Sequence, residues 1–135
     1  MKRMPLHDIK PLLNLILFNF VICRSNQKQI HRIDEVMRSR GLTTIVDTDS
    51  QHLAVTPQHK MKICQNIDEC ESILIFVTSK FMGKVNGMDG NNDICKVEYE
   101  HALRTASSKL VIVILEERMK FLSQWKGALR YVRNL

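Results

Sequence analysis

Several patterns that would assign a chemistry directly are missing from this chain. Its four cysteines form no C-x-x-C pair, which favours reduced thiols that pack as small apolar side chains. Gly83, Gly87 and Gly90 have neither the G-x-G-x-x-G nor the G-x-x-x-x-G-K-[ST] spacing, so the common glycine loops for nucleotides are excluded. The chain also has no internal repeat, no low-complexity tract and no block of like charges. Its chemistry must therefore be sought in less regular patterns.

Length and composition fit one folded domain. The chain has 135 residues, of which 44% are apolar and 25% are charged, so it can bury a core. The net charge of +6 comes from lysines and arginines that are scattered along the chain. Such an excess favours anionic partners in general, but the interleaved aromatic residues and recognition motifs of a nucleic-acid binder are absent. We therefore expect no nucleic-acid partner.

The N-terminal region contains an apolar run, Leu12–Cys23, that follows Lys2 and Arg3. This layout is similar to a secretion signal, but Asn14 and Asn19 interrupt the run and no small-x-small cleavage site follows it. The run is also too short to cross a bilayer as a helix. We expect no membrane span and a cytoplasmic location, in keeping with reduced cysteines.

Four apolar segments have the nearly continuous, β-branched character of strands that are buried on both faces. They are Leu15–Cys23, Leu42–Val46, Ser72–Thr78 and Leu110–Leu115. Apolar residues at helical spacing predict helices between them. These helices are expected from Ser25-Asn26 to Arg40, from Gln58 to about Cys70, and from Asp93 to Ala106. Residues 79–92 are expected to be irregular, with at most one helical turn at their start. Residues 1–14 form a lead-in, and residues 15–135 form the domain.

Strands that alternate with helices indicate an α/β fold, in which a parallel sheet carries helices on both faces. Right-handed crossovers leave a flavodoxin-like three-layer sandwich as the leading topology. Ligands of such sheets bind beyond the carboxyl ends of the strands. The segments of interest therefore follow Cys23, Asp47, Thr78 and Leu115, together with the helix that carries Glu98.

A calcium loop is the first alternative for the region before that helix. Asp89, Asn91, Asp93 and Glu100 fall at the first, third, fifth and twelfth positions of an EF-hand loop. However, Ile94 stands where the loop needs glycine for its sharp turn. The neighbouring strands also do not fit a helix-loop-helix unit, so calcium is the minor alternative.

Other metal and phosphate chemistries find less support. His52, His59 and His101 have no matched cysteine or carboxylate at metal-ligand spacing, and we expect them at the surface. A phosphoacceptor receiver shares the fold class, but it needs acidic residues at the ends of the first and third strands. Those ends read Cys23-Arg24 and Thr78-Ser79. We therefore expect no metal site and no phosphoacceptor.

A more specific pattern comes from several segments taken together. Cys95, Glu98 and Ala102 fit a C-x-x-E-x-x-x-A spacing within Asp93–Leu103. The other segments are Leu42–Asp49, Ile67–Thr78, Val111–Glu116 and Trp125-Lys126-Gly127. From about Leu15 to Arg130, the chain resembles the Toll/interleukin-1 receptor (TIR) domain family.

The chain departs from that family at both ends. The family's first strand ends in an F-I-S-Y-like sequence with an acidic residue soon after, whereas here the sequence reads Phe20-Val21-Ile22-Cys23-Arg24-Ser25-Asn26. The chain stops near Leu135, where the family has the end of its last helix and a fifth strand. The resemblance therefore implies a parallel sheet of four to five strands, with the last strand missing or supplied differently.

Proteins of this family act in intracellular signalling and innate-immune-type responses. Some are adaptors that associate with other TIR domains, and others are hydrolases that cleave NAD+ at the nicotinamide–ribose bond. The glutamate that the enzymes use lies in the helix after the irregular segment and matches Glu98. Cleavage builds positive charge on the ribose, which a carboxylate stabilises, and nicotinamide leaves without needing a proton. NAD+ would be a substrate, with no cofactor and no metal.

The resemblance also implies residues that bind the substrate. Arg24, just after the first strand, is placed to pair with the pyrophosphate, and Ser25 competes with it for the aligned position. Asp47, at the end of the second strand, is expected to hold the loop Asp47–Pro57 in shape over the site. Asp49 lies in the same loop and is assigned to substrate binding with it.

Two hypotheses follow for Glu98. A single glutamate near a helix N-terminus is more often a solvated residue that favours the helix dipole, but the family pattern around Glu98 favours a catalytic role. Glu100 projects from a different face of the helix and is expected to tolerate substitution. The domain is then either an NAD+ glycohydrolase that is active when several copies associate, or an adaptor in which Glu98 is incidental.

Overall fold

A computed structural model describes residues 2–5, 18–22, 27–46 and 56–134 of the chain. Its centre is a sheet of five strands in which every neighbouring pair runs parallel, in the order β1-β5-β4-β2-β3. The strands are β1 (Lys2–Pro5), β2 (Phe18–Ile22), β3 (Thr43–Val46), β4 (Ser72–Val77) and β5 (Leu110–Ile114). The predicted α/β class is confirmed.

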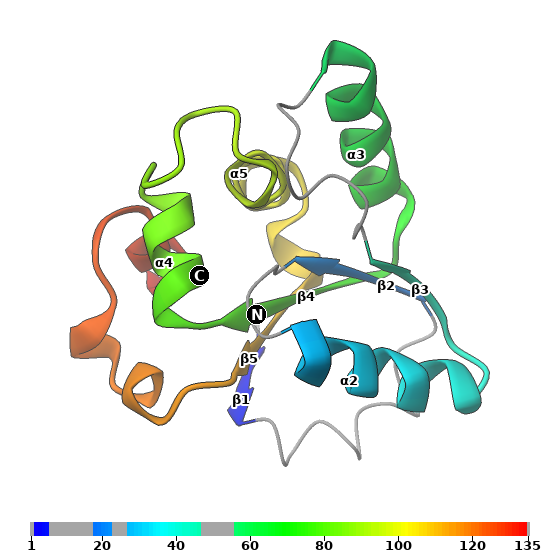
Figure 1. The fold of residues 1–135 in the computed structure, drawn as a ribbon, viewed down its shortest axis with the longest axis horizontal. Helices are drawn as coiled ribbons and strands as arrows, with labels where there is room; N and C mark the ends of the chain where they lie inside the picture. Colours follow the sequence, from blue (N-terminus) through cyan, green and yellow to red (C-terminus); the bar gives the residue numbers. More distant parts are fainter. Residues whose placement is uncertain (1, 6–17, 23–26, 47–55, 135) are drawn as a thin grey trace.

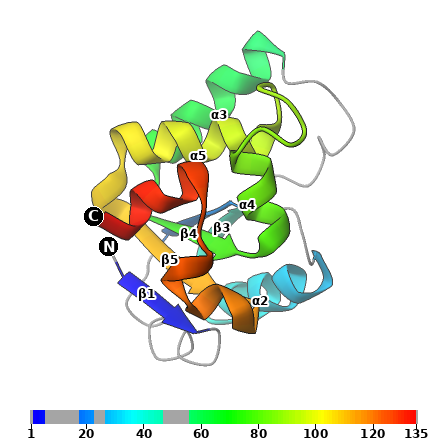
Figure 2. The ribbon, with the colours of Figure 1, turned by 90° about the vertical axis from the view of Figure 1, so that its left-hand side faces the viewer.

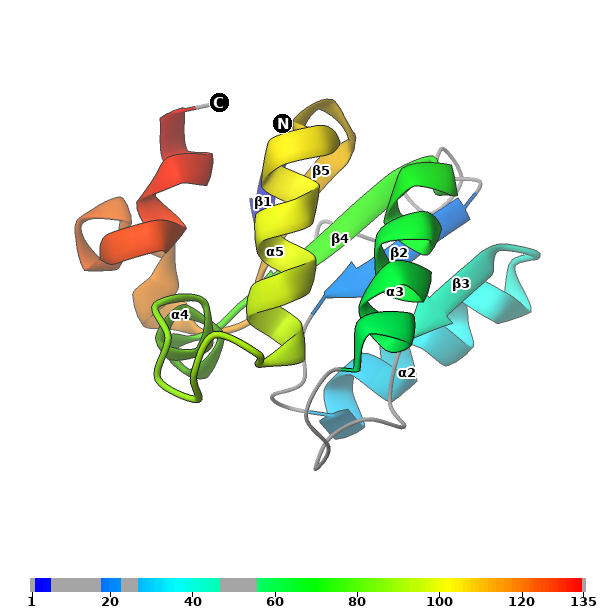
Figure 3. The same ribbon diagram turned by 90° about the horizontal axis from the view of Figure 1, so that it is seen from above.

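Helices lie on both faces of this sheet. Figure 1 shows α2 (Gln27–Ser39) on one face, and α3 (Pro57–Glu69) and α5 (Ile94–Thr105) on the other. The view from above shows α3 and α5 side by side (Figure 3). The remaining helical elements are α4 (Ser79–Val85) and the short 3-10 helices η2 (Ser107–Lys109), η3 (Glu117–Lys120), η4 (Leu122–Gln124) and η5 (Gly127–Asn134).

Side-chain caps fix where three of the helices begin. The Thr56 hydroxyl accepts a hydrogen bond from the His59 amide at the start of α3, and Asp93 accepts one from the Lys96 amide at the start of α5. Thr78 caps α4 in the same way. Each cap satisfies an amide that has no partner inside its helix. The helix from Asp93 therefore begins as predicted, whereas α4 occupies part of the segment that was expected to be irregular.

The core lies on both faces of the central strand β4, whose last five residues are buried completely. Ile30 and Met37 of α2 are buried on one side as the helical spacing predicts, but Val36 is exposed. On the other side Cys95 is buried, in agreement with the expectation that the cysteines pack as small apolar groups. Because β4 is buried on both faces, it needs apolar side chains at nearly every position, as its sequence has.

The edge strand β1 comes from the predicted lead-in. Lys2–Pro5 pairs with β5 in the register Lys2↔Val111 to Pro5↔Ile114, and Figure 2 shows β1 beside β5 at the edge of the sheet. Without β1, one side of β5 would present unpaired backbone groups. The N-terminal segment therefore forms the edge strand next to β5.

Helix α2 covers the opposite edge, which is formed by β3. The Arg38 guanidinium donates to the Thr44 carbonyl at 3.1 Å and to the Asp34 carboxylate at 3.0 Å. The Thr44 hydroxyl, which is buried, donates to Asp34 as well. These contacts use polar groups of the edge strand that would otherwise be open to another chain.

Candidate functional site

The strand order defines where a ligand is most readily bound. The connection from β2 through α2 leads to β3 on one side, and the connection from β3 through α3 leads to β4 on the other side of β2. Helix α2 therefore lies on one face of the sheet and α3 on the other, as Figure 1 shows. The strand order reverses between β2 and β4. The carboxyl ends of β2 and β4 therefore mark the switch point, the position at which open α/β sheets bind ligands.

Glu98 lies in the second turn of α5, a helix that contacts β2 and packs against α3 and α4. Its exposed fraction is only 2%, and within the described residues the other buried polar side chains are Thr44 and Thr78. The alternative in which Glu98 is a solvated helix carboxylate is therefore wrong. Burying a carboxylate is costly unless hydrogen bonds or opposite charges compensate it, and Glu98 is not without an interaction partner in the fold.

The sequence contained a signal for this burial. Glu98 is three residues after Cys95 and four residues before Ala102, and both of these side chains are fully buried. Residues at these spacings share one face of a helix. Glu98 thus lies on the same buried face of α5 as Cys95 and Ala102.

Glu100 is placed differently, as predicted. Its side chain is half exposed and pairs with the Lys96 ammonium one turn earlier on the same helix. Glu98 and Glu100 therefore differ in environment although they are two residues apart. This makes Glu100 a matched control for Glu98.

The other predicted substrate-binding residues lie outside the described residues. In the sequence, Arg24 and Ser25 come two and three residues after the end of β2, and Asp47 and Asp49 come after β3. The carboxyl end of β2 borders the switch point, and β3 is the strand next to β2. Their roles in substrate binding stay predictions.

The acidic loop before α5 already holds a cation from the protein itself. The Lys84 ammonium lies 2.9 Å from the Asp89 carboxylate and 3.0 Å from the Asp93 carboxylate. Burial alone would lower the pKa of Lys84, but its hydrogen bonds to Asp89 and Asp93 outweigh this and raise the pKa above its ordinary value. Because Glu100 pairs with Lys96, three of the carboxylates in the EF-hand pattern are bound to lysines. This geometry does not support a calcium loop.

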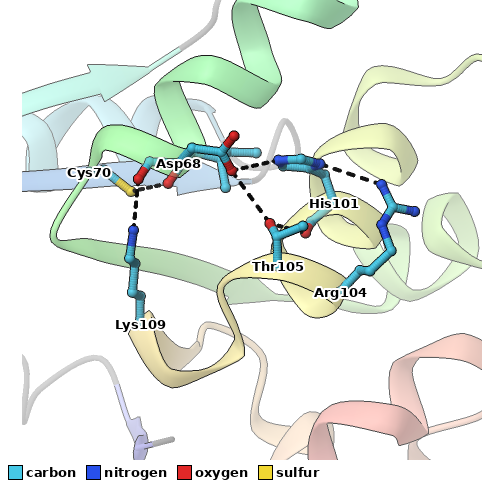
Figure 4. Close-up of polar contacts among 7 residues, drawn as sticks. Asp68, Cys70, His101, Arg104, Thr105 and Lys109 are labelled. Atoms are coloured by element: carbon cyan, nitrogen blue, oxygen red, sulfur yellow. Dashed lines mark hydrogen bonds and ion pairs between the residues drawn. The ribbon is translucent and has the colours of Figure 1, made fainter.

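Histidine 101 is part of a polar cluster between the C-terminal ends of α3 and α5. Its Nε2 lies 2.8 Å from the Asp68 carboxylate, and its Nδ1 lies 3.5 Å from the Arg104 guanidinium (Figure 4). The Lys109 ammonium donates to the Asp68 carbonyl at 2.9 Å. The His101 side chain is 12% exposed, so this histidine lies at the surface but is largely covered by its neighbours. The cluster joins the two helices.

A further polar pair at the carboxyl edge was not predicted as a site. The Ser79 hydroxyl, just after β4, donates to the Glu116 carboxylate, just after β5, at 2.8 Å. The general rule for α/β sheets pointed to the segments after Thr78 and Leu115, but it did not identify these two side chains. Nothing in their local sequence indicates that they meet across 37 positions of the chain.

No metal-binding group of three or more His, Cys, Asp or Glu side chains occurs among the residues that the structure describes. In the same part of the chain, no helix has the length and apolar character needed to cross a membrane.

Comparison with known proteins finds no matching family model, no matching curated protein and no matching solved structure. The family assignment therefore rests on the sequence pattern and enters below as a proposal.

Proposed function

We propose that this chain is a TIR-like domain that hydrolyses NAD+ to nicotinamide and ADP-ribose in intracellular signalling or an innate-immune-type response, and that it acts in the cytoplasm. The observation that carries the proposal is Glu98, a buried carboxylate on a helix that packs against β2 beside the switch point of the sheet. In the sequence pattern that resembles the TIR family, this residue matches the catalytic glutamate.

The strand order supports a flavodoxin-like architecture for the domain. Taken alone, β2, β3, β4 and β5 are arranged as β3-β2-β4-β5, which is the flavodoxin-like order of the first four strands. In this proposal β1 takes the place of the fifth strand beside β5.

The chemistry assigned to Glu98 is electrostatic. The C–N bond between ribose and nicotinamide breaks, and its electron pair neutralises the nicotinamide nitrogen. Positive charge develops on the ribose, and the Glu98 carboxylate, which is 2% exposed in the free chain, must become accessible to the bound substrate to stabilise that charge. A water molecule then bonds to the ribose carbon and releases a proton to solvent, which yields ADP-ribose.

The proposal includes association of several copies, with loops from neighbouring chains closing the site. The alternative function is a non-catalytic adaptor, which would also associate with itself or with other TIR domains. Self-association is therefore common to both functions, and NAD+ turnover separates them.

The test uses the purified full chain over a wide range of concentrations, with NAD+ added and nicotinamide release measured. Light scattering on the same samples reports the oligomeric state. We expect nicotinamide release per chain to rise with the fraction of associated protein. Association without nicotinamide release at any concentration would contradict the enzymatic proposal and favour the adaptor.

A further inference from the structure

The pair Ser79–Glu116 connects the segments that follow two neighbouring strands at the edge of the sheet where ligands bind. Both residues are partly exposed, so a ligand can reach them. The Ser79 hydroxyl donates to one oxygen of the Glu116 carboxylate, and the carboxylate has lone pairs for further donors. The side chain is therefore oriented and still able to accept hydrogen bonds.

The backbone around the pair is fixed on both sides. The Leu115 amide donates to the Val77 carbonyl at 3.2 Å, so the ladder between β4 and β5 continues up to the residue before Glu116. The Thr78 hydroxyl accepts from the Phe81 amide at 3.0 Å and sets the start of α4, where Ser79 is the first residue. A binding group needs such support to keep its geometry without a ligand.

The position of the pair suits the distant half of a dinucleotide. Neighbouring strands are about 4.8 Å apart, so the carboxyl end of β5 lies roughly 10 Å from that of β2, two strands away. The pyrophosphate of NAD+ separates its two riboses by a comparable span. A carboxylate accepts hydrogen bonds from ribose hydroxyls, as it does in many dinucleotide sites, whereas it would repel the phosphates.

We propose that Glu116, oriented by Ser79, binds the ribose hydroxyls of the adenosine half of the substrate. This inference rests on the proposed function, because it places the nicotinamide half beside Glu98. Glu116 is a binding residue here and takes no part in breaking the C–N bond.

Calorimetric binding of ADP to the full chain tests this subsite without any reaction. We expect wild-type protein to bind ADP about tenfold more tightly than 2′-deoxy-ADP or 3′-deoxy-ADP, the loss expected for one hydrogen bond to a charged group. Glu116→Gln should weaken ADP binding about tenfold and remove the discrimination between the ligands. Equal discrimination by Glu116→Gln and wild type, or no ADP binding by wild type, would overturn the proposal.

Two further variants control the experiment. Glu117→Gln changes the neighbouring carboxylate, which is 84% exposed and pairs with Lys120, and it should bind ADP as wild type does. Ser79→Ala should weaken ADP binding in the same direction as Glu116→Gln, and it serves as the test if Glu116→Gln does not fold. ADP binding with the expected discrimination but no nicotinamide release would retain the subsite and reject the hydrolase. Nicotinamide release without that discrimination would retain the hydrolase and reject the subsite.

Discussion

Asn86 holds the C-terminal segment on both sides of Gly127. Its side-chain amide donates to the Lys126 carbonyl at 3.0 Å, and its side-chain oxygen accepts from the Ala128 amide at 2.7 Å. Gly127 has a φ of +61°, and a Cβ at this position would collide with the Asn86 side chain. The glycine is therefore needed both for its backbone conformation and for the close approach of Asn86.

Gly127→Ala should lower the free energy of unfolding by about 2–4 kcal/mol, because it combines an unfavourable φ with the displacement of two hydrogen bonds. Gly41→Ala is the matched control, since Gly41 has a φ of +85° but no neighbouring atom near its Cβ position. Gly41→Ala should lower the free energy of unfolding by only about 1 kcal/mol. Urea denaturation of both variants measures the difference, and equal costs would refute the role of Asn86.

Tyr99 connects α5 to the same C-terminal segment. Its hydroxyl donates to the Ala128 carbonyl at 2.7 Å, and its ring packs edge-on against Phe81. Burial raises the pKa of Tyr99 well above its ordinary value, and the nearby Tyr131 adds to this effect. The folded protein therefore favours the neutral phenol.

Stability should fall as the pH rises above about 10, the ordinary pKa of tyrosine, because the unfolded chain can then ionise Tyr99 while the folded chain resists it. The raised pKa of Lys84 acts in the same direction at alkaline pH. Tyr99→Phe should lower the free energy of unfolding by about 1–2 kcal/mol at pH 8. Between pH 8 and pH 11 the variant should then lose less stability than the wild type does. Urea midpoints at both pH values test this. An unchanged loss in Tyr99→Phe would show that Tyr99 is not responsible.

At the scale of elements, Asp93 has two tasks at the start of α5. It accepts the Lys96 amide as the helix cap and pairs with the Lys84 ammonium of α4. The cap and the ion pair both hold the helix that carries Glu98. These two contributions can be separated by substitution, because asparagine keeps the cap and loses the charge.

Asp93→Asn should lower the free energy of unfolding by about 1 kcal/mol, and Asp93→Ala by about 2 kcal/mol, because only the alanine variant also loses the cap. Thermal or urea unfolding of the two variants checks the order. If asparagine is as costly as alanine, the side-chain cap contributes nothing to α5.

The boundaries of helices that depend on local signals could be predicted from the sequence. Asp93 before α5 and Gly41 after α2 are examples, because a cap residue or a left-handed glycine acts within one turn of the chain. The full length of helix α4 was not predicted beyond one turn, because its stability comes from Phe81 and Val85 packing into the core. The sequence around it is dominated by glycines that favour irregular structure.

At the scale of the whole molecule, β1 shows the limit of sequence reasoning. Lysine, arginine, methionine and proline at positions 2–5 have none of the β-branched character of a strand. The segment pairs because β5 offers a row of backbone groups at the edge, and proline is tolerated at an edge. The same holds for Ser79 and Glu116, which meet only because β4 and β5 are neighbours.

Deleting residues 1–5 should expose the edge of β5 and lower the free energy of unfolding by about 2–4 kcal/mol, from a few lost hydrogen bonds. The truncated chain should also aggregate more readily, because an apolar strand becomes available to other chains. A Lys2→Ala/Arg3→Ala variant keeps the backbone pairing and should behave as wild type. Urea unfolding and light scattering make the comparison, and a truncated chain of unchanged stability would mean that β1 contributes little to the sheet.

The central claim, that Glu98 is the catalytic carboxylate, is tested most directly by nicotinamide release from NAD+ in two matched variants. Glu98→Gln replaces the buried carboxyl group by an amide of similar shape, and Glu100→Gln makes the same change at the half-exposed carboxylate two residues away. We predict that Glu98→Gln lowers kcat by about 10²–10³-fold, as for the loss of one electrostatic stabiliser, while Glu100→Gln keeps the wild-type rate. A folded Glu98→Gln protein that releases nicotinamide at the wild-type rate would contradict the claim.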